Sequence, residues 1–223
     1  MGWTWGVISR KTARMSRRES KPKTVPSFDL ETAAFAEGFS VVAGIDEAGR
    51  GPWAGPVVAA AVVLDEANIP AGLNDSKKLS ATRRDELFDE ITAAAKVGIG
   101  IADVALIDDM NILQATMWAM AEGLRLLPVK PELALIDGNR APPIDCPART
   151  VVKGDAVSVS VAAASIIAKV TRDRMMVELD AQFPGYSFAR HKGYGTAIHQ
   201  NALARLGLCP AHRRSFAPIR ALF

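Results

Sequence analysis

The chain has 223 residues and is 49% hydrophobic, which suits one α/β domain with a sizeable core. Its apolar runs are far shorter than the ~20 residues of a membrane helix, and residues 1–25 lack the apolar core of a signal peptide. Cys146 and Cys209 lack metal-ligand spacing and are too few for a disulfide framework. We therefore expect reduced thiols in a cytoplasmic protein that does not contact a membrane.

The positive charge of the chain is concentrated at its N-terminus. Residues 1–25 carry +6 whereas the whole chain carries +3, so the remaining residues carry −3. The body is therefore not a generally basic nucleic-acid binder, and its phosphate contacts must come from local patches. We expect residues 1–26 to be a disordered tail with a weak, salt-sensitive attraction to nucleic acid. An organelle presequence is the alternative for this acid-poor segment. Residues 27–223 are expected to form one domain.

The first half of the chain predicts three strands and a helix. Residues 39–46 and 56–64 are apolar runs, and the second does not alternate, which predicts a strand buried on both faces. Ser80 is expected to cap a helix over residues 82–96. Residues 97–104 are expected to form the third strand.

The middle of the chain predicts a long helix and two short strands. The helix is expected to begin at Asp108 or Asp109 and to end before Pro128. Residues 133–137 are expected to form a parallel, central strand, and residues 149–153 a fifth strand.

The last third of the chain is expected to be mainly helical. Residues 157–179 have apolar side chains at helical spacing, residues 183–196 form a loop, and Thr196 caps a last helix that Gly207 ends. The whole pattern predicts a mixed sheet flanked by helices in a single α/β domain.

Adjacent carboxylates, Asp46 and Glu47, stand at the end of the first expected strand. Neighbouring side chains of a strand point to opposite faces, so the two acids share a site only where the chain leaves the pleat. Gly49, Gly51 and Gly55 favour such a departure. Close carboxylates are costly unless a cation or a proton lies between them, and a hard divalent metal meets that need. The alternative is a surface turn with two solvated acids.

Two further acids follow strand-like runs. Asp137 ends the run 133–137, and open α/β sheets place ligands at such carboxyl ends. Asp155 follows a glycine just before the long helix. A turn-forming role for Asp137 and an N-cap role for Asp155 remain open. Four acids without comparable His or Cys ligands predict Mg²⁺ or Mn²⁺, and two such ions suit phosphodiester cleavage.

Cations near these acids fit a phosphate substrate. Arg50 lies between two glycines that allow backbone amides to approach a ligand, and a surface arginine in a turn is the alternative. Lys77 and Lys78 lie in a polar turn that holds phosphates or is merely solvated. Lys169 and Arg172 lie one helical turn apart on the long helix, where an ion pair with Asp173 or Glu178 is the competing interpretation. Ser165 of the same helix is a further candidate for substrate binding.

An aromatic side chain lies in a glycine-rich loop. Tyr194, between Gly193 and Gly195, suits stacking on a sugar or base, and a packed loop anchor is the alternative. The three histidines, at positions 191, 199 and 212, have no ligand spacing and are expected not to bind metal.

Eight motifs occur in a characteristic order and spacing: GIDEAGRG, AGPVVAAAVVL, NDSKKL, LIDGN, VVKGD, AAASIIAKVTRD, HKGYGT and HRRSF. They resemble bacterial type 2 ribonuclease H (ribonuclease HII), over roughly residues 40–220. The resemblance implies a ribonuclease H-like fold and a metal-dependent endonuclease that leaves a 5′-phosphate. Its expected substrates are the RNA strand of RNA–DNA hybrids and, cut on the 5′ side, single ribonucleotides in duplex DNA, as in ribonucleotide excision repair.

The resemblance also implies roles for individual residues. It assigns catalysis and the binding of two Mg²⁺ or Mn²⁺ ions to the four acids: Asp46, Glu47, Asp137 and Asp155. It assigns recognition of the ribose 2′-hydroxyl to Gly49, Arg50 and Gly51, and contact with the junction sugar to Tyr194. It implies a monomer. Two features depart from the pattern of the family: the basic tail has no role assigned by the resemblance, and the sequence up to Phe223 has little room for the longer helical C-terminal extension of some members.

Two other classes remain open. A different two-metal enzyme, such as an exonuclease or a transposase-like protein, would not need the Gly-Arg-Gly motif or Tyr194. A non-enzymatic RNA–DNA binding module would be repelled by four acids without metal. Cleavage of a duplex with one ribonucleotide, but not of all-DNA duplex, separates these classes.

Overall fold

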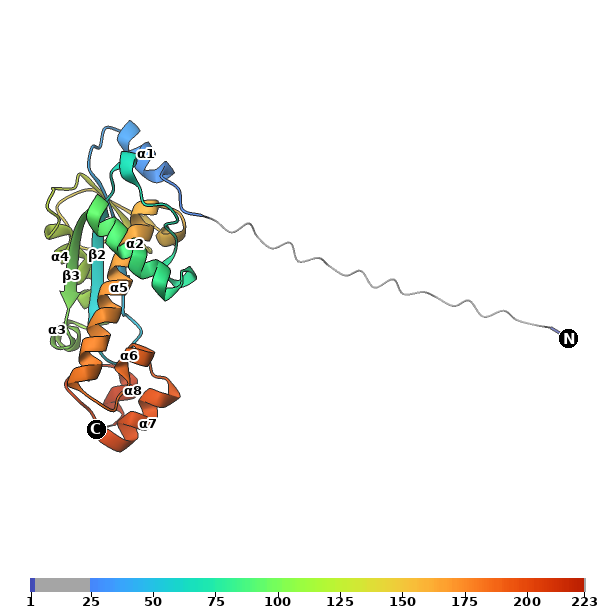
Figure 1. Cartoon of the computed structure of the whole chain (residues 1–223), viewed down its shortest axis with the longest axis vertical. Helices are drawn as coiled ribbons and strands as arrows, with labels where there is room; N and C mark the ends of the chain where they lie inside the picture. Colours follow the sequence, from blue (N-terminus) through green and yellow to red (C-terminus); the bar gives the residue numbers. More distant parts are fainter. Residues whose placement is uncertain (3–24, 223) are drawn as a thin grey trace.

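The computed structural model describes residues 1–2 and 25–222 (Figure 1). The expected basic tail lies, apart from its two ends, outside the described residues, so the tail and the domain boundary stay predictions. In the described part, none of the helices is both long and apolar enough to cross a membrane.

One five-stranded mixed sheet organises the domain, and all five expected strands are present. They are β1 (Val42–Ala48), β2 (Val57–Val63), β3 (Lys96–Ala102), β4 (Leu133–Asp137) and β5 (Ala148–Val151). Their order is β3-β2-β1-β4-β5. β2 is antiparallel to both β1 and β3, whereas β4 is parallel to β1 and β5. The parallel direction of β4 is confirmed, but the central strand is β1.

Helices cover both faces of the sheet. α3 (Val104–Met110) and α4 (Ile112–Arg125) lie on one face, and α2 (Ala81–Ala94) and α5 (Val159–Gln182) on the other (Figure 1). Alternate residues of β2 enter different cores: Ala59 and Ala61 pack with α4, whereas Ala60 and Val62 pack with α2 and α5. This confirms that β2 is buried on both faces.

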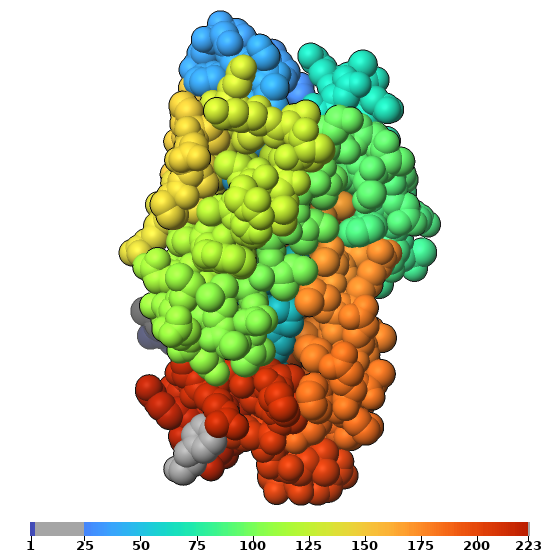
Figure 2. All heavy atoms as spheres, turned by 90° about the vertical axis from the view of Figure 1, so that its left-hand side faces the viewer, coloured from blue at the N-terminus to red at the C-terminus, as the bar shows by residue number. Residues whose placement is uncertain are grey.

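Shorter helices close the two ends of the domain. α1 (Asp29–Ala36) lies at one end, whereas α6 (Phe188–His191), α7 (Ala197–Leu206) and α8 (Ala217–Arg220) gather at the other around the C-terminal half of α5 (Figure 1). Figure 2 shows the face covered by α3 and α4 in green, with the red C-terminal helices below it. A separate core of Met176, Phe188, Leu203 and Ile219 holds that lower end together.

The helix expected from Asp108 or Asp109 to Leu127 is in fact two helices. Asp103 caps α3, and Asn111, with φ 71°, then starts α4 by accepting hydrogen bonds from the N–H groups of Leu113 and Gln114. Asn tolerates this left-handed backbone and is a good N-cap, so the apolar periodicity continues while the helix does not.

Other differences are smaller. The expected loop at residues 183–196 contains α6, and neither α1 nor α8 was expected from the sequence. The caps are as expected, because Ser80 Oγ accepts from Arg83 N–H and Thr196 Oγ1 accepts from His199 N–H.

Candidate active site

Strand register brings two of the acids together. Ile45 of β1 pairs with Ile136 of β4, so Asp46 and Asp137 occupy the next position on neighbouring parallel strands. Both isoleucines pack in the core beneath α4. Since side chains alternate along a strand, Asp46 and Asp137 both face the α5 side. Asp46 is only 5% exposed.

The first strand does not end at Asp46, as the sequence had indicated. Its ladder with β4 ends at Ile45, but its ladder with β2 continues to Ala48 opposite Val58. β1 therefore carries Glu47 beyond the edge of β4, where the loss of pairing leaves room beside the two aspartates. Glu47 donates its N–H to Asp46 Oδ1 at 2.7 Å, and its carboxylate lies 3.4 Å from Arg50 Nη1.

The fourth acid comes from the connection between β5 and α5. Asp155 lies in the 3₁₀ turn η3 (Gly154–Ala156), where the Gly154 N–H donates to Asp137 Oδ1 at 2.7 Å. Asp155 does not cap α5, because Ser158 is the N-cap and accepts from the Val161 N–H. The N-cap alternative is therefore wrong for Asp155, and a hydrogen bond ties its turn to the end of β4.

Burial and nearby negative charges disfavour the charged form of three of the acids, Asp46, Glu47 and Asp155. Burial, and then the charges of Glu47 and Asp137, raise the pKa of Asp46 well above its ordinary value. Burial also raises the pKa of Glu47, although Arg50 opposes the shift. The pKa of Asp155 is raised by burial and then by the charges of Asp75 and Asp137. A cluster of buried carboxylates without enough positive charge has the oxygen donors and the negative charge that a hard divalent cation requires.

Arg50 and Lys77 supply the positive charge that the acids face in this structure. Lys77 Nζ lies 3.9 Å from Asp155 Oδ2. Burial alone would lower the pKa of Lys77, but the charges of Asp46 and Asp155 raise it. Within residues 25–222, no three His, Cys, Asp or Glu side chains already converge as a metal site. The fit of these acids to a metal ion rests on their oxygen donors and their negative charge, and not on a preformed cluster.

The glycine-flanked loop, residues 49–56, lies against the loop that carries Tyr194. The backbone N–H of Trp53 donates to the Gly193 carbonyl at 2.8 Å. A Cβ placed on Gly51 would lie 3.5 Å from Tyr194 Cε1. Tyr194 is 49% exposed as a whole residue, while its backbone is anchored by hydrogen bonds with His191 and His199. The backbone is thus a loop anchor, and the ring remains accessible beside Gly51.

Arg172 has a different place from the one expected. It is 1% exposed and donates to the carbonyls of Ala54, Pro56 and Lys192, so it neither faces solvent nor pairs with an acid. Of the two candidate cations, Lys169 and Arg172, only Lys169 forms the alternative ion pair, with Asp173 at 2.7 Å.

The polar turn at residues 74–80 lies beside the fourth acid. It forms the 3₁₀ helix η2 (Ser76–Lys78), which exposes Lys77 and places Lys78 3.8 Å from Asp75. Ser165 lies beneath this turn at 3% exposure, where its hydroxyl accepts from the Ser76 N–H and donates to the Ala162 carbonyl. In this structure Ser165 supports the turn from inside.

The three histidines, which have no ligand spacing in the sequence, form one buried cluster. His199 Nε2 lies 3.0 Å from His212 Nε2, and the rings of His191 and His199 stack with centroids 4.5 Å apart. Burial lowers the pKa of His199 to about 4, which keeps the ring neutral. The cluster holds the Tyr194 backbone, since His199 Nδ1 lies 3.0 Å from the Tyr194 carbonyl. Sequence spacing gave no signal for this contact.

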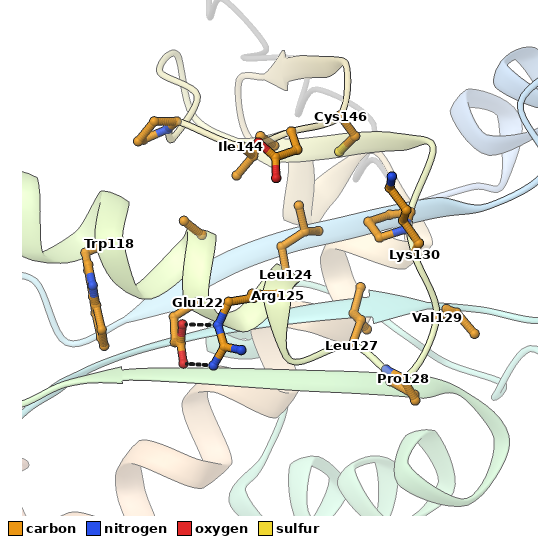
Figure 3. Close-up of a pocket in the computed structure, with 14 residues that line it drawn as sticks. Trp118, Glu122, Leu124, Arg125, Leu127, Pro128, Val129, Lys130, Ile144 and Cys146 are labelled. Carbon is orange, nitrogen blue, oxygen red and sulfur yellow. Dashed lines mark hydrogen bonds and ion pairs between the residues drawn. The ribbon is translucent and has the colours of Figure 1, made fainter.

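A cavity of about 440 Å³ lies away from the acids. Its walls are the C-terminal half of α4 and the segments 128–131 and 143–146, which precede β4 and β5 (Figure 3). It therefore lies at the opposite end of these strands from Asp137. The Glu122–Arg125 ion pair and Cys146, one of two free thiols in the described chain, line it.

The comparison with known proteins decides the family. A family model described as ribonuclease HII matches residues 43–219. This chain belongs to the ribonuclease HII family. It is 58% identical to a ribonuclease HII from Azorhizobium caulinodans over 210 residues, which cover 93% of this chain and 81% of the relative. The family assignment makes the protein a metal-dependent ribonuclease that hydrolyses the RNA strand of RNA–DNA hybrids.

Solved structures support the fold of this ribonuclease HII. Ribonuclease H2 from Pyrococcus horikoshii OT3 matches with a TM-score of 0.68 and 29% identity, over 82% of this chain and 97% of that one. Bst-RNase HIII in complex with Mn²⁺ matches with a TM-score of 0.66 over 96% of this chain and 77% of that one. At 23% identity, the second likeness shows the shared fold alone.

Proposed function

We propose that this ribonuclease HII also nicks duplex DNA on the 5′ side of a single embedded ribonucleotide, using two divalent ions. The observation that carries the proposal is the adjacency of two features. The acids of β1 and β4 meet at one strand end. The loop that begins three residues after Asp46 presents its backbone beside the exposed ring of Tyr194.

The acids are the proposed ligands of Mg²⁺ or Mn²⁺. When bound, such ions supply an activated water and stabilise the leaving oxygen of a phosphodiester. Asp46 and Asp137 are fixed by the register of two neighbouring strands, and Asp155 is fixed through the Gly154–Asp137 hydrogen bond. Glu47 stands beyond the β4 ladder next to Arg50. This support from several elements keeps the carboxylates close in spite of their repulsion.

The loop and the tyrosine are the proposed readers of the sugar. A 2′-hydroxyl both donates and accepts hydrogen bonds, so backbone groups can recognise it in either sense. Gly51 has no side chain to keep a sugar away from its backbone, and the Tyr194 ring lies next to it. The ring would stack on the sugar on the other side of the junction.

Exposed cations near the acids are the proposed phosphate contacts. Arg50 and Lys77 lie close to the carboxylates, and Lys78 lies on the same turn as Lys77. Lys169 is held by Asp173 and would contribute through its remaining N–H donors. Ser165 would act indirectly, because its hydroxyl supports the turn that bears Lys77.

Three labelled duplexes test the proposal: an RNA–DNA hybrid, a DNA duplex with one ribonucleotide, and an all-DNA duplex. We expect Mg²⁺-dependent cleavage of the first two, with the single-ribonucleotide product ending one nucleotide 5′ of the ribose. Asp46→Asn should abolish both activities, whereas Asp109→Asn, at an exposed acid of α3, should leave them unchanged. Cleavage of the hybrid without any cut at a single ribonucleotide would contradict the proposed junction activity.

A further inference from the structure

A buried arginine lies beneath the glycine-flanked loop. Arg213 is 0% exposed, and its guanidinium donates to five backbone carbonyls of one short segment. The acceptors and their distances are Gly49 at 2.6 Å, Arg50 at 3.1 Å, Pro52 at 2.8 Å, Gly55 at 2.8 Å and Pro56 at 3.1 Å. A guanidinium has five N–H donors, so this number of acceptors uses its full capacity.

Arg213 is charged at neutral pH without an ion-pair partner in the described chain. Burial, and then the charge of Arg172, lower its pKa to about 9, and Asp108 acts on it only from a distance. Arg172 donates to the Ala54 and Pro56 carbonyls of the same segment. Burying unpaired cations is costly. The five hydrogen bonds from Arg213 define the conformation of residues 49–56, and no other side chain has five N–H donors.

The direction of the carbonyls determines where the N–H groups point. Every described peptide bond is trans, so each carbonyl points away from the N–H of the same peptide unit. The carbonyls of Gly49 and Arg50 point to Arg213. The N–H groups of Arg50 and Gly51 therefore point away from it. Neither of them donates to another backbone carbonyl in the described residues.

We propose that Arg213 is a positioning residue that sets the preference for ribose, because it holds the Arg50 and Gly51 N–H groups outward as a pair of donors. This inference rests on the proposed function. The pair lies beside the Tyr194 ring, and Pro52 ends it because proline has no N–H. Two adjacent outward donors suit an oxygen acceptor of the substrate, namely the 2′-oxygen of a ribose or a phosphate oxygen next to it.

Arg213→Lys tests the inference, because lysine keeps the charge but cannot bind five carbonyls at once. Arg83→Lys is the matched control. Arg83 also donates to a backbone carbonyl, that of Ala71, but it lies on α2 outside the site. Both full-length variants would be assayed in Mg²⁺ on duplexes whose single modified sugar carries 2′-OH, 2′-F or 2′-H. Thermal unfolding would be recorded in parallel.

We expect the wild-type protein and Arg83→Lys to prefer 2′-OH strongly, and Arg213→Lys to lose at least tenfold of that preference. A folded Arg213→Lys variant with the wild-type ratio of 2′-OH to 2′-F cleavage would overturn the inference. Absence of single-ribonucleotide cleavage by wild type would instead overturn the proposed junction activity.

A measurement on the wild-type protein covers the case in which Arg213→Lys does not fold. Amide ¹H–¹⁵N shifts would be followed in metal-free buffer, where the substrate stays intact. We expect the Arg50 and Gly51 signals to move more on adding the single-ribonucleotide duplex than on adding all-DNA duplex. Equal responses to the two duplexes would contradict outward donors that read ribose.

Discussion

Gly49→Ala should lower the stability of this protein, whereas Gly51→Ala should lower its cleavage rate at a single ribonucleotide. Gly49 has φ +100°, where a side chain is strained, and a Cβ there would lie 2.0 Å from Arg172 Nε and 2.7 Å from the Pro56 carbonyl. Arg172 cannot move aside freely, because its Nε is itself bonded to that carbonyl at 2.9 Å. Gly51 does not have a left-handed backbone, and its Cβ would meet only Tyr194 Cε1 at 3.5 Å, an ordinary contact.

These contacts give the expected magnitudes. For Gly49→Ala, a strained backbone costs about 1–3 kcal/mol and overpacking about as much again, so we expect a loss of about 2–6 kcal/mol. That corresponds to a fall in Tm of roughly 4–24 °C for a domain of this size. For Gly51→Ala we expect a change within about 0.5 kcal/mol. Its new methyl group would instead stand between the loop backbone and the substrate sugar, reducing cleavage at a single ribonucleotide about tenfold or more.

Thermal unfolding and single-turnover cleavage of the single-ribonucleotide duplex provide the two readouts. We expect Gly49→Ala to be unstable and Gly51→Ala to be stable but slow. A Gly49→Ala protein with the wild-type Tm would refute the account of the loop's packing. A Gly51→Ala protein with wild-type rate and ribose preference would refute the account of sugar recognition.

Four further expectations concern the metal, the histidines, the tyrosine and the tail. Asp46→Asn should abolish cleavage and remove most of the Mg²⁺-induced rise in Tm, while the metal-free protein becomes more stable, since one of four repelling acids is gone; a less stable metal-free variant would contradict this. Because burial lowers the pKa of His199 from 6.5 to about 4, its contribution to stability is complete above pH 6.5 and falls as the pH falls towards 4. The loss is at most about 3 kcal/mol, measured as the free energy of unfolding against pH, and an unchanged value between pH 7 and pH 4.5 would contradict it. Tyr194→Ala should slow junction cleavage more than Tyr194→Phe, since a stacked ring contributes about 1–3 kcal/mol; equal rates for wild type and Tyr194→Ala would exclude the ring from the site. Deleting residues 1–25 should spare catalysis at low salt and weaken duplex binding by an amount that fades as salt rises; an inactive protein at low salt would show a structural role instead.

Features encoded locally in the sequence were predicted well. The five strands follow from apolar runs bounded by turn residues, and Ser80 and Thr196 cap their helices through side chains only three residues from their donors. The four acids became candidates because each lies at or near the end of such a run, although β1 extends to Ala48 and Asp155 lies in η3. The prediction of a single helix across Asn111 was wrong. The apolar periodicity continues through this residue, but its left-handed backbone and its capping side chain begin a new helix.

Only the tertiary structure decided which side chains support the site. Arg213 binds carbonyls that precede it by 157 to 164 residues, and every residue has a carbonyl, so such a bond leaves no mark on the sequence around its acceptor. His199 and His212 are 13 residues apart and meet through ring nitrogens, a contact that their spacing in the sequence did not indicate. The extra length of β1 likewise depends on its antiparallel partner β2. The sequence determined the acids and the strands that carry them, because those signals are local. Folding determined the buried arginines that hold the loop, because their partners are backbone carbonyls distant in the sequence, and it determined the histidine cluster, because its rings meet only when the C-terminal end packs.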